Sequence, residues 1–177
     1  GKVLITQGNK NEVIVEGDKD LLEKIETEVR GGRLSIKNRR ERWWNNGNRR
    51  NRLTVYITVK KLRGAYISGS GDIISQNTLK TDDFTASIAG SGDIEIDLDA
   101  EYVESKISGS GNIELQGTSD KAKLSISGSG KYLAEKLKVG DYRISMSGSG
   151  RGSINLDGDL DVRISGSGKI YYIGKPT

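Results

Sequence analysis

The fold of this chain is decided by the segment Ile67-Ser68-Gly69-Ser70-Gly71-Asp72-Ile73, because variants of this segment recur along the rest of the sequence. Each copy contains Ser-Gly-Ser-Gly, or once Ala-Gly-Ser-Gly, and successive copies start 18 to 21 residues apart. The copies start at Ser68, Ala89, Ser108, Ser127, Ser147 and Ser165. Self-similarity at a nearly constant period predicts a solenoid, in which each repeat stacks on its neighbours.

Apolar side chains alternate with polar ones on both sides of each copy. The residue just before the motif is Ile67, Ile88, Ile107, Ile126, Met146 or Ile164. A period of two indicates strands with one buried face, so each repeat should run as strand, corner, strand and polar turn. Such repeats predict an all-β fold, a single-stranded parallel β-helix of about six rungs. Right-handed coiling is expected from the chirality of parallel crossovers.

The motif glycines are interpreted as structural corners, because a sharp bend stacked on every rung needs positive φ or very close backbone approach. These glycines are Gly69, Gly71, Gly90, Gly92, Gly109, Gly111, Gly128, Gly130, Gly148, Gly150, Gly166 and Gly168. A phosphate-binding loop at Gly128-Ser129-Gly130-Lys131 is disfavoured. Such a loop has four residues between its glycines and Ser or Thr after its lysine.

The first 61 residues lack the repeat and are expected to form a β-rich cap on the repeats of residues 62–177, within one domain over 1–177. Residues 3–5 and 13–16 should pair as strands, and residues 18–26 should form a short helix capped by Asp18. Gly31-Gly32 predicts a hairpin turn. The alternating run 53–59 should lead into the first rung.

The composition excludes several classes of function. Cys and His are both absent, which removes Cys nucleophiles, Ser-His-Asp triads, disulfides and the usual zinc sites. No apolar stretch approaches the roughly 20 residues of a membrane helix, so no transmembrane segment is expected. Between Arg30 and Arg63 there are twelve Lys or Arg and one acid, Glu41, although the whole chain has a net charge of only +4. A basic N-terminal end therefore joins an acidic body.

The sequence resembles the head GIN domain family of auto-transporter adhesins over nearly its whole length. The similarity lies in residues 13–18 (Val-Ile-Val-Glu-Gly-Asp), Leu21-Leu22, Leu34-Ser35-Ile36, and 55–59 (Val-Tyr-Ile-Thr-Val), continuing through Leu62 into the first motif. The resemblance implies an exported β-helical protein of the bacterial envelope, periplasmic, anchored to the outer membrane or on the cell surface. It implies a signal peptide or lipoprotein leader, and because the chain begins Gly1-Lys2-Val3, we expect such a segment upstream. No enzymatic activity, cofactor or catalytic residue comes with it.

The segment 38–52 is the most distinctive part of the chain outside the repeat. It combines six arginines with both tryptophans, and it should protrude as a loop between two strands. The candidate ligand-binding residues are Arg39, Arg40, Arg42, Trp43, Trp44, Arg49, Arg50 and Arg52. Charge plus aromatic stacking suits an anionic glycan or another envelope component, and nucleic acid is not expected. The alternative is a variable loop whose tryptophans pack back onto the end of the rod.

The residues that follow each corner form a column from acidic to basic: Asp72, Asp93, Asn112, Lys131, Arg151 and Lys169. Asp72, Asp93 and Asn112 on adjacent rungs are a candidate Ca²⁺ site, because they offer oxygen ligands. The alternative interpretation is a solvated ladder of like side chains.

Two further hypotheses concern catalysis and self-association. Asp93, Glu95, Asp97 and Glu114 on the outer face could serve a polysaccharide lyase or glycoside hydrolase, although such a pair needs two different environments. The C-terminal rung ends with little sequence left to cover it. Either Pro176 blunts that edge or a second copy stacks on it.

Overall fold

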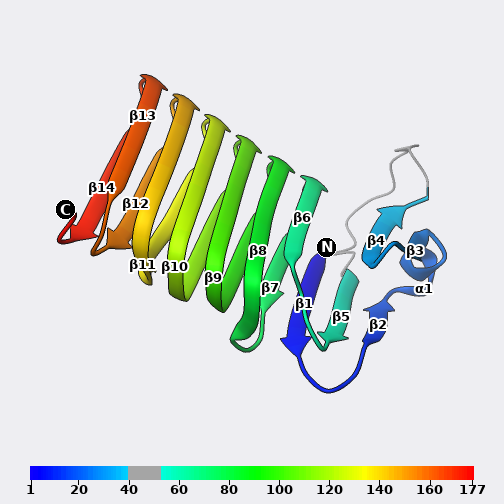
Figure 1. The fold of residues 1–177 in the computed structure, drawn as a ribbon. Coiled ribbons are helices and arrows are strands. Elements are labelled where there is room, and N and C mark those ends of the chain that lie inside the picture. Colours follow the sequence, from blue (N-terminus) through cyan, green and yellow to red (C-terminus); the bar gives the residue numbers. More distant parts are fainter. Residues whose placement is uncertain (40–52) are drawn as a thin grey trace.

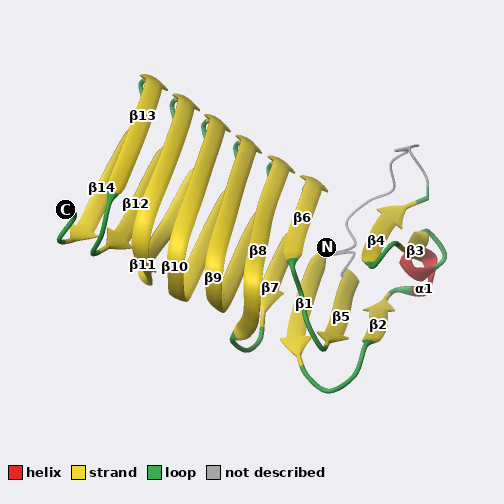
Figure 2. Ribbon diagram, viewed as in Figure 1, coloured by secondary structure: helices red, strands yellow, loops and turns green. Residues whose placement is uncertain are grey.

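The computed structural model describes residues 1–39 and 53–177 and folds them as a solenoid rod with smaller strands at its N-terminal end (Figures 1 and 2). Twelve strands form one sheet that winds through the rod, and β3 and β4 form a separate hairpin. The strands are β1 (Lys2–Gln7), β2 (Glu12–Gly17), β3 (Ile25–Arg30), β4 (Arg33–Asn38), β5 (Leu53–Val59), β6 (Gly64–Gly69), β7 (Asp72–Ser75), β8 (Leu79–Gly90), β9 (Asp93–Gly109), β10 (Asn112–Gly128), β11 (Lys131–Gly148), β12 (Arg151–Leu156), β13 (Leu160–Gly166) and β14 (Lys169–Gly174). The helix among these residues is α1 (Lys19–Leu22).

The predicted parallel solenoid of about six turns is confirmed. The described ladders between neighbouring rungs are all parallel, and at the strands after each corner they keep the repeat in register, so that Ile94 pairs with Ile113 and Ile113 with Tyr132. The register shifts near the bend in the β10–β11 and β11–β12 ladders. One detail differs from expectation. In β9, β10 and β11 the predicted polar turn is a bend within a continuous strand that runs from one corner to the next. Pairing with the adjacent rung holds the strand through the bend, whereas the last repeat has a true turn between Leu156 and Leu160.

The inward-facing residues of successive rungs stack in columns and form the core. Residues in one column are buried to similar degrees, as for Val103, Ala122 and Tyr142, which are 0–4% exposed. Burying each large aliphatic side chain contributes about 1.5–3 kcal/mol, and the stacking repeats this gain on every rung. The alternation of apolar and polar residues in the sequence corresponds directly to these inward and outward positions.

From the second corner onward, the two glycines of a corner meet different requirements. The first, as in Gly148, has φ of +108°, and a Cβ there would lie 2.6 Å from the carbonyl oxygen of Gly128 on the rung before. The second, as in Gly150, lacks positive φ, but a Cβ there would lie 2.7 Å from Cγ2 of Ile126. Glycine is thus needed first for backbone conformation and then for close packing of one rung on the next. The serines of the corners are exposed and make no hydrogen bond through their hydroxyls within the described residues.

The N-terminal strands extend one face of the solenoid. β1 pairs in parallel with β7 of the first rung and with β5, and β2 pairs antiparallel with β5. The predicted pairing of residues 3–5 with residues 13–16 is therefore wrong, because β5 lies between β1 and β2. β1 instead continues the parallel ladder of the rungs, with Val3 opposite Ile73.

The hairpin of β3 and β4 turns through Gly31 and Gly32, both with positive φ, as predicted. It is attached to the rod by side chains: Leu34 and Ile36 pack against the core, and the Arg33 guanidinium lies 4.8 Å from the Tyr66 ring centre. The predicted short helix is present, but Asp18 makes no side-chain capping bond. The backbone carbonyl of Asp18 accepts hydrogen bonds from the N–H groups of Leu21 and Leu22.

Candidate functional site

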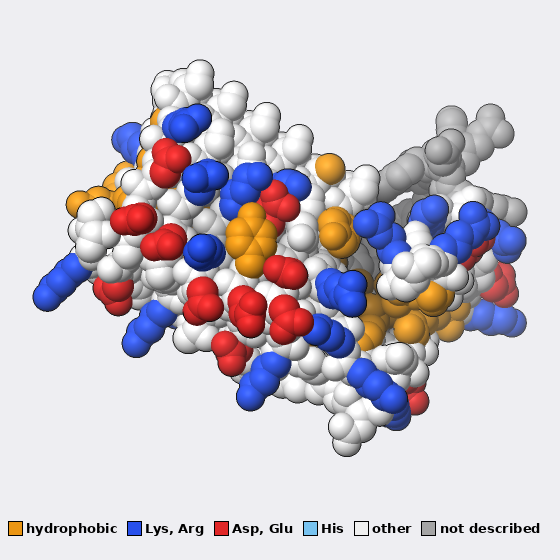
Figure 3. Space-filling model, in the orientation of Figure 1, with side chains coloured by type: hydrophobic (Ala, Val, Ile, Leu, Met, Phe, Trp, Pro, Cys, Tyr) orange, Lys and Arg blue, Asp and Glu red, His pale blue; other side chains and the backbone are white. Residues whose placement is uncertain are grey.

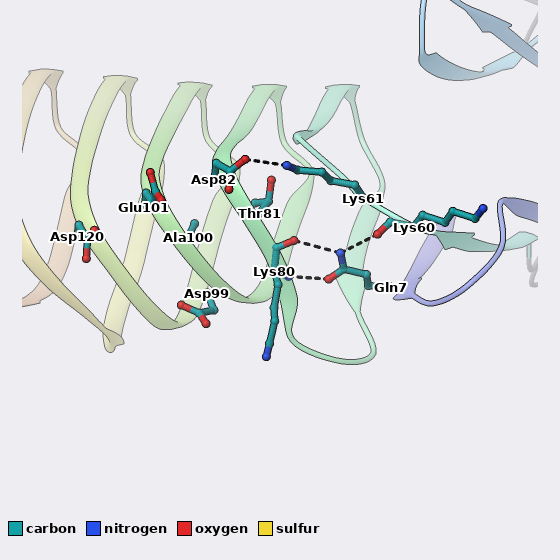
Figure 4. A pocket seen from close by; sticks show the side chains of 10 residues that line it. All are labelled: Gln7, Lys60, Lys61, Lys80, Thr81, Asp82, Asp99, Ala100, Glu101 and Asp120. Carbon is teal, nitrogen blue, oxygen red and sulfur yellow. Dashed lines mark hydrogen bonds and ion pairs between the residues drawn. The ribbon is translucent and has the colours of Figure 1, made fainter.

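A shallow groove of about 430 Å³ lies where the N-terminal strands meet the first rungs (Figure 4). Its walls come from the ends of β1 and β5 on one side and from the bends of β8, β9 and β10 on the other. The lining residues are Gln7, Lys60, Lys61, Lys80, Thr81, Asp82, Asp99, Ala100, Glu101 and Asp120.

The side chain of Gln7 fixes the two sides of the groove to each other. Its Oε1 accepts a hydrogen bond of 2.6 Å from the Lys80 N–H, and its Nε2 donates to the carbonyl oxygens of Lys60 at 2.9 Å and Lys80 at 3.1 Å. The Asn77 side chain in turn exchanges two hydrogen bonds of 2.9 Å with the Gln7 backbone. These contacts tie the end of β1 to the start of β8, so the groove has a fixed base.

Part of the charge in the groove is satisfied locally. Lys61 Nζ lies 2.7 Å from Asp82 Oδ2, and its hydrogen bond and positive charge hold the pKa of Asp82 below the ordinary value of 3.8. Asp99 accepts a hydrogen bond of 2.8 Å from the Thr118 hydroxyl. The other charged side chains of the groove are therefore available to a ligand.

Lys60, Lys80, Glu101 and Asp120 make no ion pair with any described residue. The ammonium groups of Lys60 and Lys80 point away from Gln7, whereas the carboxylates of Glu101 and Asp120 lie towards the later rungs (Figure 4). Ammonium donors and carboxylate acceptors in one groove can bind a polar ligand by hydrogen bonds and charge.

Sequence reasoning missed this groove because its residues come from separate repeats and from the cap. Lys80 and Asp99 occupy matching positions on neighbouring rungs, just before the bend. Aligning the repeats on the residues that flank the bends, as was done for the corners, would have placed Lys80 and Asp99 side by side.

The predicted Arg/Trp site lies almost entirely outside the described residues. Arg39, the first residue of the set, follows β4 and is exposed, and its backbone N–H donates to the Lys24 carbonyl at 2.7 Å. Arg40, Arg42, Trp43, Trp44, Arg49, Arg50 and Arg52 fall within residues 40–52, beyond the described ranges.

The structure places Asp72, Asp93 and Asn112 in one column, each in register with the next. Asn112 turns its amide nitrogen towards Asp93, with Nδ2 donating to Oδ1 at 2.7 Å. Within residues 1–39 and 53–177, no group of three or more His, Cys, Asp or Glu side chains could hold a metal ion. The Ca²⁺ site stays a prediction, and a cation there would have to displace the Asn112 amide group from Asp93.

The four outer-face carboxylates considered for catalysis lie along β9 and β10, and the groove includes none of them. Asp93 is bonded to Asn112, and Asp97 Oδ2 accepts a hydrogen bond of 3.2 Å from Gln116 Nε2. Glu95 and Glu114 are neighbours in the ladder. Asp93 and Asp97 are thus engaged in hydrogen bonds to side-chain amides of the next rung, and an acid–base pair among these four carboxylates stays a prediction.

Glu104 and two lysines form an ionic cluster on the outer face of β9 and β10. Glu104 lies 3.1 Å from Lys106 Nζ and 3.3 Å from Lys123 Nζ. Partial desolvation raises the pKa of Glu104, but hydrogen bonds from Lys106 and Lys123 outweigh it, so the pKa falls below 4.5. This cluster lies on the surface of the ladder and is not part of the groove.

A polar pair also lies inside the core. The hydroxyls of Tyr132 and Tyr142 are 3.2 Å apart and buried. Desolvation raises the pKa of both phenols, and for Tyr142 the neighbouring Tyr132 raises it further. Among the described residues Ser105 Oγ is buried and makes no hydrogen bond of standard geometry, although it lies near enough to the Tyr132 hydroxyl to oppose the rise in the pKa of that phenol. The pair satisfies two hydroxyls at once, which indicates a role in packing.

The fold and the groove together define a parallel β-solenoid that carries a charged, open site at its N-terminal end. A family model described as "Putative auto-transporter adhesin, head GIN domain" matches residues 1–176. The chain belongs to this head GIN domain family.

Solved structures with the same fold come from species of Parabacteroides and Bacteroides. A "putative lipid binding protein" from Parabacteroides distasonis is 26% identical, with a TM-score of 0.77 over 99% of this chain and 82% of that one. A "putative adhesin" from Bacteroides fragilis is 23% identical, with a TM-score of 0.78 over 99% and 87%. A second "putative adhesin", from Parabacteroides merdae, is 18% identical, with a TM-score of 0.70 over 99% and 82%.

Among curated proteins, none matches the chain. In the described ranges no helix has the length and apolar character needed to span a membrane.

Proposed function

We propose that this protein is a non-catalytic binding module of the bacterial cell envelope, an adhesin head whose rigid solenoid presents a basic N-terminal end to an anionic glycan or another envelope component. The observation that carries the proposal is that Lys60 and Lys80 line one groove, are exposed and make no ion pair with a described residue, with their ammonium groups pointing away from Gln7 on different sides (Figure 4). Family membership supports an adhesive role and export to the envelope.

The lining of the groove holds three lysines and four carboxylates, so the support for an anionic ligand comes from the basic side chains beside the groove. Figure 3 shows Lys and Arg side chains gathered at the N-terminal end of the rod, over the smaller strands. Arg39 ends the same hairpin whose Arg33 contacts Tyr66, and the chain then enters the Arg/Trp segment. Charge steers a polyanion to such an end, and the tryptophans would add stacking on sugar rings.

The groove also bears on the description of the Parabacteroides distasonis structure as a putative lipid-binding protein. Lysines and carboxylates line it, so it suits the polar head of an amphiphile or a charged sugar better than an acyl chain. The catalytic alternative, a lyase or glycoside hydrolase, would need the outer-face carboxylates to converge in a cleft.

The test is binding of immobilised heparin and polygalacturonate, two anionic glycans, to the wild-type protein and to two charge-matched variants. Lys60→Gln/Lys80→Gln removes the groove ammonium groups. The control Lys131→Gln/Lys169→Gln removes two lysines of the column that follows the corners. We expect the groove variant to weaken binding by about tenfold or more and the control to leave it nearly unchanged.

Equal losses in both variants would indicate unspecific attraction of charge and contradict the proposal. If the groove variant still binds as the wild type does, the Arg/Trp segment becomes the candidate binding site. A third variant with Trp43, Trp44 and Arg42 replaced by Ala then tests that segment, and unchanged binding there would contradict the adhesive role for both surfaces.

A further inference from the structure

The last rung exposes side chains at positions that the preceding rung buries. Val162, Ile164 and Tyr172 are 36%, 43% and 55% exposed, whereas the residues beside them on the preceding rung, Ile144, Met146 and Ile154, are 0–2% exposed. These three side chains point inward along the solenoid columns, and within the described residues no further rung covers them. The last described rung therefore presents an open cross-section of the core.

The same end carries two strand edges without partners. β13 pairs only with β11, and β14 pairs only with β12, so each strand has one free row of backbone donors and acceptors. Pro176 does not blunt these edges, because it lies beyond the end of β14. The tail around it runs on beside the preceding rung, with the Lys175 N–H donating to the Leu156 carbonyl at 3.1 Å and the Thr177 N–H to the Gly158 carbonyl at 3.0 Å. Exposed edges beside apolar side chains are sites for pairing with another chain.

We propose that this end is a docking surface for a second copy of the chain, stacked tail to tail about a two-fold axis. Two free edges at a fixed separation require a partner with two edges at the same separation, and the last rung of a second copy has this spacing. The N-terminal end does not, because β1, β5 and β2 extend one face there while β6 ends the other. A two-fold axis across the interface makes the facing strands antiparallel.

The charges on β13 are self-complementary in that arrangement. If β13 pairs with its copy around Val162, Asp161 of each chain faces Arg163 of the other, and Leu160 faces Ile164. Asp161 already lies 3.5 Å from Arg143 and 3.7 Å from Arg163 in its own chain. The second copy would thus add an arginine to the column in which Glu104, Lys123, Arg143 and Asp161 follow one another. Opposite charges directly across an antiparallel pair stabilise it.

The test is sedimentation velocity on the wild-type protein over a concentration series, with charge variants on β13. We expect a reversible dimer in the wild type. Asp161→Arg and Arg163→Asp should each weaken the dimer by about tenfold or more, because each places like charges opposite one another. The double variant Asp161→Arg/Arg163→Asp should dimerise again. An equimolar mixture of the two single variants should form a heterodimer, in which every facing pair is opposite in charge.

The control Lys131→Glu changes a charge away from the last rung and should leave the dimer unaffected. Thermal melting of each variant by circular dichroism shows that the solenoid is intact. A strictly monomeric wild type at concentrations on the order of 100 µM would overturn the proposal, since it excludes dissociation constants in the micromolar range. A dimer insensitive to both single variants would overturn it equally. Binding of anionic glycans at the other end is independent of either result.

Discussion

Gly128 stands directly on Gly109 in the stacked corners, where a Cβ on Gly128 would lie 2.5 Å from the Gly109 carbonyl oxygen. Gly128 also has φ of +121°, in the region that L side chains rarely adopt. The position therefore combines two independent requirements for glycine, one from its own backbone and one from the rung before it.

We predict that Gly128→Ala lowers the free energy of unfolding by more than about 3 kcal/mol, because backbone strain and the clash with the Gly109 carbonyl add together. Urea unfolding followed by circular dichroism measures the change. Ser129→Ala, at the exposed position next to it in the same corner, is the control and should stay within about 0.5 kcal/mol of the wild type. Equal effects of the two substitutions would show that the corner tolerates a Cβ.

The second glycines of two successive corners should differ in tolerance. A Cβ on Gly150 would meet Cγ2 of Ile126 at 2.7 Å and the Gly130 carbonyl oxygen at 3.0 Å. A Cβ on Gly168 would meet the side chain of Met146, and the nearest carbonyl oxygen, that of Gly150, is 3.3 Å away. Met is unbranched and flexible, whereas the branched Ile is confined by its β-carbon.

We therefore predict that Gly168→Ala costs less stability than Gly150→Ala, by about 1 kcal/mol or more. The same urea measurement compares the two variants directly. In a Met146→Ile background, Gly168→Ala should cost as much stability as Gly150→Ala does in the wild type, because a branched side chain then faces the added Cβ. A larger cost at Gly168 than at Gly150 would contradict this account of the packing.

The buried Tyr132–Tyr142 pair should make stability depend on pH in the alkaline range. Burial raises the pKa of both phenols in the folded state above 10.0, so the folded protein keeps protons that the unfolded chain releases. The stabilising contribution is complete below pH 10 and is lost as the pH rises further. The free energy of unfolding should therefore decrease above about pH 10.

Tyr142→Phe should reduce that decrease by up to about 1.4 kcal/mol per pH unit, the value for one retained proton. It should also cost about 1–2 kcal/mol at neutral pH, because it leaves the Tyr132 hydroxyl buried without its partner. Ile126→Val is the control: it lowers stability in the core without changing a titratable group. If the alkaline slope of Tyr142→Phe equals that of Ile126→Val, the pair does not titrate as described.

The sequence predicts the solenoid well because period and alternation are local properties repeated six times. Each corner has the same glycines, and each inward column has the same kind of side chain, so errors in one repeat are corrected by the others. The N-terminal part has no such redundancy. The insertion of β5 between β1 and β2 depends on Val55 pairing with both Val3 and Val15, contacts between residues far apart in the chain. Nearest-neighbour pairing of strands was a reasonable expectation there and it was wrong.

The groove escaped prediction for a related reason. Gln7, Lys60 and Lys80 are distant in sequence and meet only because β1 and β5 extend the face of the first rung. Charged residues at bends look like ordinary solvated positions when each repeat is read alone. The Arg/Trp segment is the reverse case. Its composition is recognised from the sequence alone, whereas residues 40–52 lie outside the described structure.

The parallel ladder has a mechanical consequence for a protein of this family. Hydrogen bonds between rungs run along the rod, and the two chain ends lie towards its opposite ends (Figure 1). Tension between the ends therefore acts along these hydrogen bonds and separates the rungs one after another. β13 and β14 are held on one side only, so the last rung should detach first and lengthen the chain under load while the rest of the rod stays folded.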